Sequence, residues 1–132
     1  MDFVSIRVIT DDVARLAGFY EKATGAQATR YTEDFAELKT AHATLAIGST
    51  RTVPLFAPGA ARPASNSTVI IEFLVDDVDG VHQNLAGFVE DFVQEPTTMP
   101  WGNRSLLFRD PDGNLVNFFT PVTQSAIDKF VP

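Results

Sequence analysis

The 132-residue chain contains no cysteine, one tryptophan and two histidines. Without cysteine, disulfide bonds, thiolate metal sites and cysteine nucleophiles are excluded. Lys and Arg number 10 against 17 Asp and Glu, which gives a formal net charge of -7, and no basic cluster occurs. A chain with this charge lacks the positive surface that binds the phosphates of nucleic acids. We therefore expect no nucleic-acid partner.

Long apolar segments are also missing. No run approaches the length of a membrane span, and the N-terminal MDFVSIRV lacks the basic start and long apolar stretch of a signal peptide. We therefore expect no membrane partner and a cytoplasmic location. Apolar residues still make up 45% of the chain and include 11 Phe. That is enough for one ordinary hydrophobic core, which predicts a single domain over 1–132.

The first part of the chain changes its hydrophobic period after about ten residues. An alternating, β-branched segment predicts a strand over about 3–10. In the next segment, DDVARLAGFYEKATG, apolar residues recur at steps of three and four, which predicts an amphipathic helix. Asp11 or Asp12 is placed to cap its start, and Gly25 follows its end. Three strand candidates follow, AQATRYT, FAELKT and ATLAIGS, so the first module, about 1–50, is predicted as βαβββ.

The same pattern returns after a linker. A stretch rich in Pro, Ala, Ser and Gly at about 51–67 shows no helical or alternating pattern and is predicted as the linker. The segment TVIIEFLVDDVDGVHQNLAGF then leads a strand into a helix through Asp77 and Val78, as the first part does through Asp12 and Val13. The offset is 65 residues, from 77 - 12 and 78 - 13. Strands predicted near 89–94, 104–109 and 115–120 complete a second βαβββ module at about 68–121, and TQSAIDKF predicts a short C-terminal helix at about 123–131.

Two motifs make this tandem pattern more specific. The helix DDVARLAGFYEKATG and the segment WGNRSLLFRDPDGNLVNFF resemble the vicinal oxygen chelate superfamily, which includes glyoxalases, bleomycin resistance proteins and extradiol dioxygenases. DPDGN, between two predicted strands, is the most diagnostic piece. The resemblance covers about 2–121. It implies an α+β fold in which tandem βαβββ modules form one cupped, barrel-like mixed sheet around a ligand cavity, with the helices outside.

In metal-dependent members, the resemblance implies four ligand positions, one on the first and one on the last strand of each module. In this chain those positions hold Ser5, Ile47, Ile70 and Asn117. A catalytic divalent metal needs about three ligands from imidazole, carboxylate or thiolate groups. None of the four residues supplies one. We therefore expect no metal site and no cofactor, and no catalytic residue is assigned.

Strand alternation predicts which side chains would line the cavity. If Ser5 faces it, Arg7 does as well, and by the same reasoning Ile70 and Glu72 share a face. Arg7 and Glu72 are repeat equivalents, because 72 - 7 is again 65, and we expect them to lie within reach of each other. Trp101, in a polar loop between strands, is predicted to form a wall or lid. The predicted ligand-binding residues are Ser5, Arg7, Ile47, Ile70, Glu72, Trp101, Asn117 and Phe119.

The sequence favours a metal-free protein of the glyoxalase/bleomycin resistance type that sequesters a partly apolar or aromatic, antibiotic-like small molecule. One alternative is a lyase, isomerase or dioxygenase-like enzyme of the same superfamily acting on a small metabolite. Another is an interaction module with a vestigial pocket. His82 lies beside the core stripe of the second helix and is predicted to be structural, whereas His42 is predicted at a turn. A curled sheet exposes strand edges, which favours a homodimer.

Overall fold

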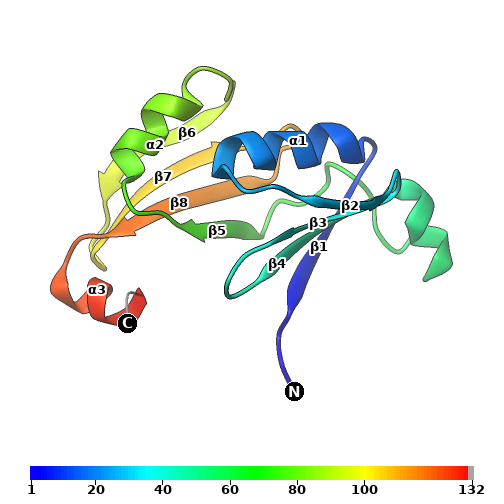
Figure 1. Ribbon diagram of the computed structural model, residues 1–132, viewed down its shortest axis with the longest axis horizontal. Helices are drawn as coiled ribbons and strands as arrows, with labels where there is room; N and C mark the ends of the chain where they lie inside the picture. The colour runs from blue at the N-terminus through cyan, green and yellow to red at the C-terminus, as the bar shows by residue number, and fades with distance from the viewer. Residues whose placement is uncertain (131–132) are drawn as a thin grey trace. The chain divides into compact units, whose positions relative to one another are not determined.

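A computed structural model describes residues 1–130, which fall into two compact units, 1–66 and the described residues from 67 onward. The first unit contains β1 (Ser5–Thr10), α1 (Val13–Thr24), β2 (Thr29–Thr32), β3 (Phe35–Lys39), β4 (Thr44–Ser49) and a 3-10 helix, η1 (Thr50–Leu55). The second contains β5 (Ile70–Leu74), α2 (Val78–Leu85), β6 (Phe92–Thr98), β7 (Asn103–Arg109), β8 (Leu115–Pro121) and α3 (Gln124–Phe130). Figure 1 labels the helices α1 to α3 and the strands β1 to β8 along the chain.

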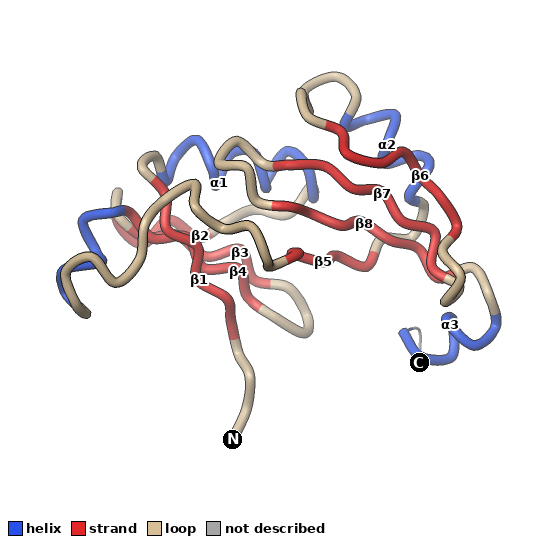
Figure 2. The backbone as a smooth tube through the Cα atoms, turned by 180° about the vertical axis from the view of Figure 1, so that it is seen from behind, coloured by secondary structure: helices blue, strands red, loops and turns tan. Residues whose placement is uncertain are grey.

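Each unit holds one four-stranded mixed sheet with the same connectivity. The strand order is β1-β4-β3-β2 in the first sheet and β5-β8-β7-β6 in the second. In both, the first strand runs parallel to the last, and the other pairs are antiparallel. Figure 2 traces the backbone with these strands in red. The predicted α+β class and tandem βαβββ modules are confirmed, with the strands divided between two hydrogen-bonded sheets.

The two strand-to-helix junctions are capped in the same way. Asp12 and Asp77 adopt nearly identical extended conformations, with φ of -142° in both. The Asp12 carboxylate accepts a hydrogen bond from the Arg15 backbone N–H, and the Asp77 carboxylate accepts one from Gly80. These side chains satisfy donors that the first helical turn leaves without a partner. Gly25 ends α1 in the left-handed conformation, with φ of 74°, so the predicted caps are confirmed.

One face of the first sheet packs against α1 and forms the core of that unit. The helix contributes its predicted apolar stripe, in which Leu16, Ala17 and Tyr20 are almost fully buried. The sheet contributes a matching set of buried side chains from β3 and β4, namely Ala36, Leu38, Leu45 and Ile47. The opposite face of this sheet, which we call the first open face, carries Arg7 and Phe35.

The second sheet packs an aromatic cluster against α2. Phe118 meets Phe73 and Phe108 edge-on, with ring centroids 5.3 and 5.0 Å apart. The His82 ring lies edge-on to Phe92 at 5.1 Å, so this histidine belongs to the packing as predicted. We call the opposite face of the sheet the second open face, and it carries Glu72 and Asn117 on neighbouring strands.

Three segments differ from the sequence prediction. The strand predicted near 89–94 is β6, which lies at Phe92–Thr98. The region at about 51–67 was predicted to lack regular structure, but the 3-10 helix η1 forms its start, with the Ser49 hydroxyl accepting a hydrogen bond from the Arg51 backbone N–H. The sequence did not predict η1, because a six-residue helix that contains Pro54 shows no hydrophobic periodicity. The C-terminal helix ends at Phe130, and position 131 of its predicted range lies outside the described residues.

Candidate functional site

Arg7 lies on the first open face between aromatic side chains. Its guanidinium carbon is 4.6 Å from the centroid of the Phe35 ring and 5.5 Å from that of Phe56. Phe56 follows η1 and is 72% exposed. The negative faces of these rings attract the positive guanidinium. Arg7 itself is exposed to solvent.

The aromatic surface around Arg7 continues toward β2. The Tyr31 ring stacks on Phe35 at 5.8 Å with an interplanar angle of 27°, and the Lys39 ammonium lies 5.8 Å from the Tyr31 centroid. Lys39 also approaches the Glu37 carboxylate at 3.8 Å. The first open face therefore carries an aromatic stripe, formed by Tyr31, Phe35 and Phe56, that two cationic side chains contact.

Strand register decides which β4 residue faces the same way as Arg7. Arg7 pairs with Ala46, whereas Ile47 pairs with Val8 and is fully buried on the face that α1 covers. The prediction that Ile47 shares a face with Ser5 and Arg7 is therefore corrected. In the second unit Glu72 pairs with Asn117, so the register equivalent of Asn117 is Ala46. Ser5, two residues before Arg7, lies half-buried at the start of β1 on the Arg7 side.

Asn117 and Glu72 form a polar pair on the second open face. The Asn117 Nδ2 donates a 2.8 Å hydrogen bond to the Glu72 carboxylate. Asn117 is only 8% exposed, while Glu72 is exposed. The Asn117 Oδ1 is buried and accepts no hydrogen bond from any described residue. Buried amide oxygens usually have a partner, and in residues 1–130 only the Asn103 Oδ1 shares this lack of one.

Apolar side chains flank this polar pair. Ile70 and Leu74 lie two residues before and after Glu72 on β5, so they share its face of the sheet. Each is 46% exposed. Phe119 lies two residues beyond Asn117 on the same face, but it is 6% exposed and its ring meets Phe130 of α3 edge-on at 5.0 Å. Of the predicted apolar contacts, Ile70 is accessible and Phe119 is largely covered within its own unit.

Trp101 occupies the turn between β6 and β7 and is 66% exposed. The turn is closed by a hydrogen bond from the Gly102 N–H to the Met99 carbonyl, and Gly102 has φ of 96°. The Gly102 carbonyl accepts from the N–H groups of Val122 and Thr123, which ties the turn to the segment before α3. Trp101 is exposed on a loop as expected, and its contact with a ligand stays a prediction.

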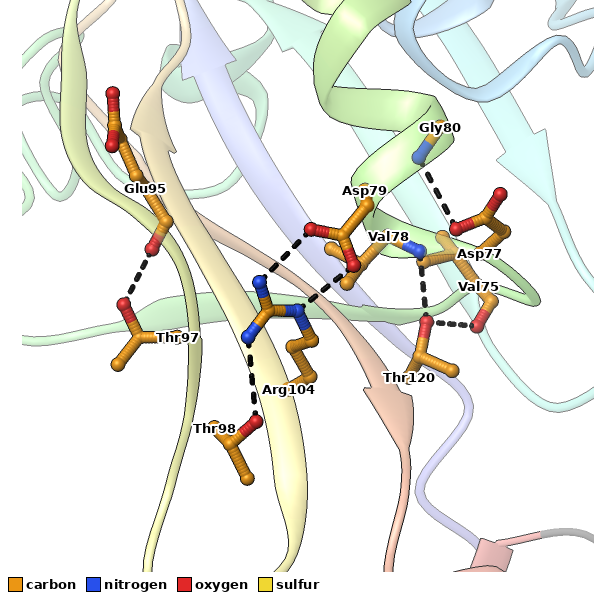
Figure 3. A network of polar contacts seen from close by, with 10 residues as sticks. All are labelled: Val75, Asp77, Val78, Asp79, Gly80, Glu95, Thr97, Thr98, Arg104 and Thr120. Carbon is orange, nitrogen blue, oxygen red and sulfur yellow. Dashed lines mark hydrogen bonds and ion pairs between the residues drawn. The ribbon is translucent and has the colours of Figure 1, made fainter.

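A polar network fixes α2 to the strands that carry the second open face (Figure 3). The Thr120 hydroxyl accepts from the Val78 N–H and donates to the Val75 carbonyl, at 3.0 and 2.8 Å. Arg104 donates two hydrogen bonds to Asp79, at 2.8 and 3.0 Å (Figure 3). These hydrogen bonds hold the pKa of the Asp79 carboxyl below its usual range. These contacts hold α2 against its face of the sheet. None of them involves Asn117, whose side chain bonds to Glu72 on the opposite face.

The DPDGN motif forms the turn that sets the β7–β8 register. The Asp110 carboxylate accepts from the backbone N–H groups of Asp112 and Asn114 and from the Asn114 side chain, at 2.8 to 3.0 Å. Gly113 has φ of 83°, a conformation that glycine adopts without strain. The motif is structural here, as a turn, and it places Asn117 opposite Leu107 and beside Glu72. Sequence analysis missed the role of Asp110 and Asn114, although Asp and Asn are common in such turns.

The four positions that the resemblance assigns to metal ligands do not fit a divalent metal. Ile70 has no donor atom, and neither Ile47 nor its corrected equivalent Ala46 has one. Asn117 and Ser5 offer only a neutral amide oxygen and a neutral hydroxyl. In residues 1–130, no group of three or more His, Cys, Asp or Glu side chains is arranged to hold a metal ion. Among those residues there is also no helix of sufficient length and apolarity to cross a membrane.

Several solved structures share the fold of this chain. No curated protein matches the sequence. A glyoxalase/bleomycin resistance protein/dioxygenase from Nocardioides is 20% identical with a TM-score of 0.75, covering 94% of this chain and 85% of that one. A protein of unknown function from Agrobacterium tumefaciens is 23% identical with a TM-score of 0.79, covering 92% and 95%.

A family enzyme of the same description from Burkholderia phytofirmans is 18% identical with a TM-score of 0.79, covering 92% of this chain and 100% of that one. At these identities the likeness establishes the fold alone. The sequence profile of the family matches residues 2–118, nearly the whole span of both modules. The chain therefore belongs to the Glyoxalase/Bleomycin resistance protein/Dioxygenase superfamily.

Proposed function

We propose that the protein binds a small, partly apolar molecule, without a metal, through a hydrogen-bond donor that the ligand presents to Asn117 and Glu72. The observation that carries this proposal is the buried Asn117 Oδ1, which accepts no hydrogen bond from residues 1–130. Leaving a buried acceptor without a partner costs about 1 to 3 kcal/mol. A bound donor would recover that free energy, and such a gain favours ligand binding at this position.

The orientation of the Asn117 amide supports this reading. Its Nδ2 donates to the Glu72 carboxylate, and a flipped amide would place an oxygen against that carboxylate instead. The hydrogen-bond network therefore assigns the amide oxygen to the remaining side of the group. The Glu72 carboxylate is exposed on the second open face beside the buried Asn117 Oδ1, so a ligand donor that reaches the amide oxygen would lie next to the carboxylate. A protonated amine is the best complement, because hydrogen bonds between ionised groups are about twice as strong as neutral ones.

The apolar surroundings define the rest of the ligand. Ile70 and Leu74 are each 46% exposed beside Glu72, so an aliphatic or aromatic group attached to the amine would cover them. Burial of such area stabilises by about 25 cal/mol per Å². The combination of a few polar groups with an apolar surround is typical of small-molecule sites. It agrees with superfamily membership and with sequestration of a partly aromatic compound.

Benzylamine, with benzyl alcohol and benzoate for comparison, tests the proposal in calorimetric and NMR titrations. We expect benzylamine to shift the Asn117 side-chain amide resonances at lower concentrations than either comparison compound. E72Q and N117L should each weaken benzylamine binding by about tenfold or more, because each loses a charged or buried hydrogen bond. E95Q is the matched control, since Glu95 is exposed on β6 away from this pair.

Circular dichroism should show that each variant is folded. Equal benzylamine affinity in wild type, E72Q and N117L would contradict the proposal. The proposal would also be contradicted if benzoate shifted the Asn117 side-chain resonances of the wild-type protein at lower concentrations than benzylamine does.

A further inference from the structure

We propose a second binding site, for a carboxylate on a flat aromatic body, at Arg7 on the first open face. This site lies in the other unit and takes a group of opposite charge, so it goes beyond the binding function proposed above. It rests on the space built around Arg7, on the rings that contact its guanidinium, and on the absence of an acceptor for its donors among residues 1–130.

Small residues make room for the Arg7 side chain on the sheet. Its strand partner is Ala46, which is 2% exposed. The next β4 residue on this face is Gly48, where an added Cβ would lie 3.7 Å from the Arg7 Cδ, 3.5 Å from the Ile9 Cδ1 and 3.1 Å from the Thr52 Oγ1. These neighbours fill the space that a larger residue would need. The stem of Arg7 therefore packs against the sheet, which limits its freedom before any ligand binds.

The aromatic rings then position the guanidinium. Phe35 comes from β3 and Phe56 from the end of η1, so the sheet and the 3-10 helix each contribute a ring. Phe56 is held by a hydrogen bond from its backbone N–H to the Val53 carbonyl. Rings that contact the planar guanidinium leave its N–H edge available, because the donors lie in the plane of the group.

Two of the four other arginines of this unit are paired with carboxylates. Arg30 pairs with Glu21, and Arg51 pairs with Asp34. Arg7 has no hydrogen bond or ion pair with any other described residue of its unit, and unlike the exposed Arg15 and Arg62 it contacts two aromatic rings. An oriented guanidinium with free donors matches a carboxylate, which it can bind through two parallel hydrogen bonds.

The surrounding charge favours a monoanion over a phosphate. Lys39, the nearest further cation along the aromatic stripe, contacts Tyr31 and approaches the Glu37 carboxylate. A single guanidinium therefore faces the ligand. Because the net charge of the protein is -7, it would repel a dianion more strongly than a monoanion. Phe56, which contacts the Arg7 guanidinium and is 72% exposed, offers an apolar ring to the body of the ligand. An aromatic carboxylate satisfies both features.

NMR titration with benzoate, observed at the Arg7 Hε resonance, tests this site directly. We expect benzoate to shift that resonance and to bind more tightly than acetate, which lacks the ring, and than phenyl phosphate, which carries more charge. R7K keeps the charge but loses the planar fork, and both R7K and R7Q should weaken benzoate binding by about tenfold. F56A should weaken it by about threefold through the lost ring contact.

R15Q is the matched control, because Arg15 is an exposed arginine on α1, and it should bind benzoate like the wild type. Wild-type benzoate affinity in R7Q would overturn the proposal, as would tighter binding of phenyl phosphate or an unshifted Arg7 Hε. Retained benzoate affinity in R7K would show that charge alone acts and would overturn the bidentate geometry. Failure at Arg7 would leave the benzylamine result unchanged, since that experiment is read at Asn117.

Discussion

Replacing Asn117 with aspartate should destabilise the protein in a way that depends on pH. The wild-type amide donates a 2.8 Å hydrogen bond to the Glu72 carboxylate. N117D keeps the size of the side chain but removes this donor and places a second carboxylate beside the first. At neutral pH the variant therefore loses a hydrogen bond and gains a repulsion between like charges at a position that is 8% exposed.

The size of the effect follows from these two contributions. Two unit charges about 4 Å apart interact by about 4 kcal/mol at an effective dielectric constant of about 20. Because Glu72 is exposed, solvent screens the repulsion, and we reduce it to about 1 to 3 kcal/mol. The lost hydrogen bond adds about 1 kcal/mol. We expect N117D to lower the free energy of unfolding by about 2 to 4 kcal/mol near pH 7.

The pH dependence has a defined sign. Repulsion raises the pKa of the carboxyl pair in folded N117D above its value in the unfolded chain, so the folded variant binds more protons. Its deficit is therefore small at about pH 4, where a shared proton can bridge the carboxyls, and it grows as the pH rises. Urea unfolding at both pH values, followed by circular dichroism, measures this.

The exchanged pair E72Q/N117D provides the control, because it restores one amide donor opposite one carboxylate. It should be more stable than N117D by at least about 1 kcal/mol near pH 7. The reasoning fails if N117D loses equal stability at both pH values, or if the exchanged pair recovers nothing.

Two further predictions concern a turn and a surface carboxylate. G102A should cost more than about 2 kcal/mol, because the residue has φ of 96° and its Cβ would lie 2.0 Å from the Thr123 Oγ1. G113A, with φ of 83° and nothing within 4 Å, should cost about 1 kcal/mol; similar urea midpoints for the two would contradict the close contact at Gly102. Hydrogen bonds from the Ser49 hydroxyl and then from Arg51 hold the pKa of Asp34 below its usual range. This stabilisation is present above the unfolded pKa and is lost as pH falls through the folded pKa, so D34N should lower the urea midpoint near pH 7 and the difference should vanish toward about pH 3. A D34N deficit that persists at the acid end would refute this assignment.

The sequence by itself determined the order and type of most elements. Hydrophobic period distinguishes the strand before Asp12 from the helix after it, and the same junction at Asp77 revealed the tandem repeat. The caps at Asp12, Asp77 and Gly25 were predictable because a cap depends on residues within one helical turn. The DPDGN turn was predictable for the same reason, since its hydrogen bonds join residues at most four positions apart.

Only the tertiary structure decided which side chains meet on the open faces. Glu72 and Asn117 lie 45 positions apart and come into contact through the β5–β8 register. The correction from Ile47 to Ala46 has the same origin, because a shift of one residue moves a strand side chain to the other face of its sheet. Phe56 was assigned to an unstructured linker, but its position at the end of η1 brings its ring to Arg7. Local propensity reports on neighbours along the chain, whereas these contacts depend on packing between distant segments.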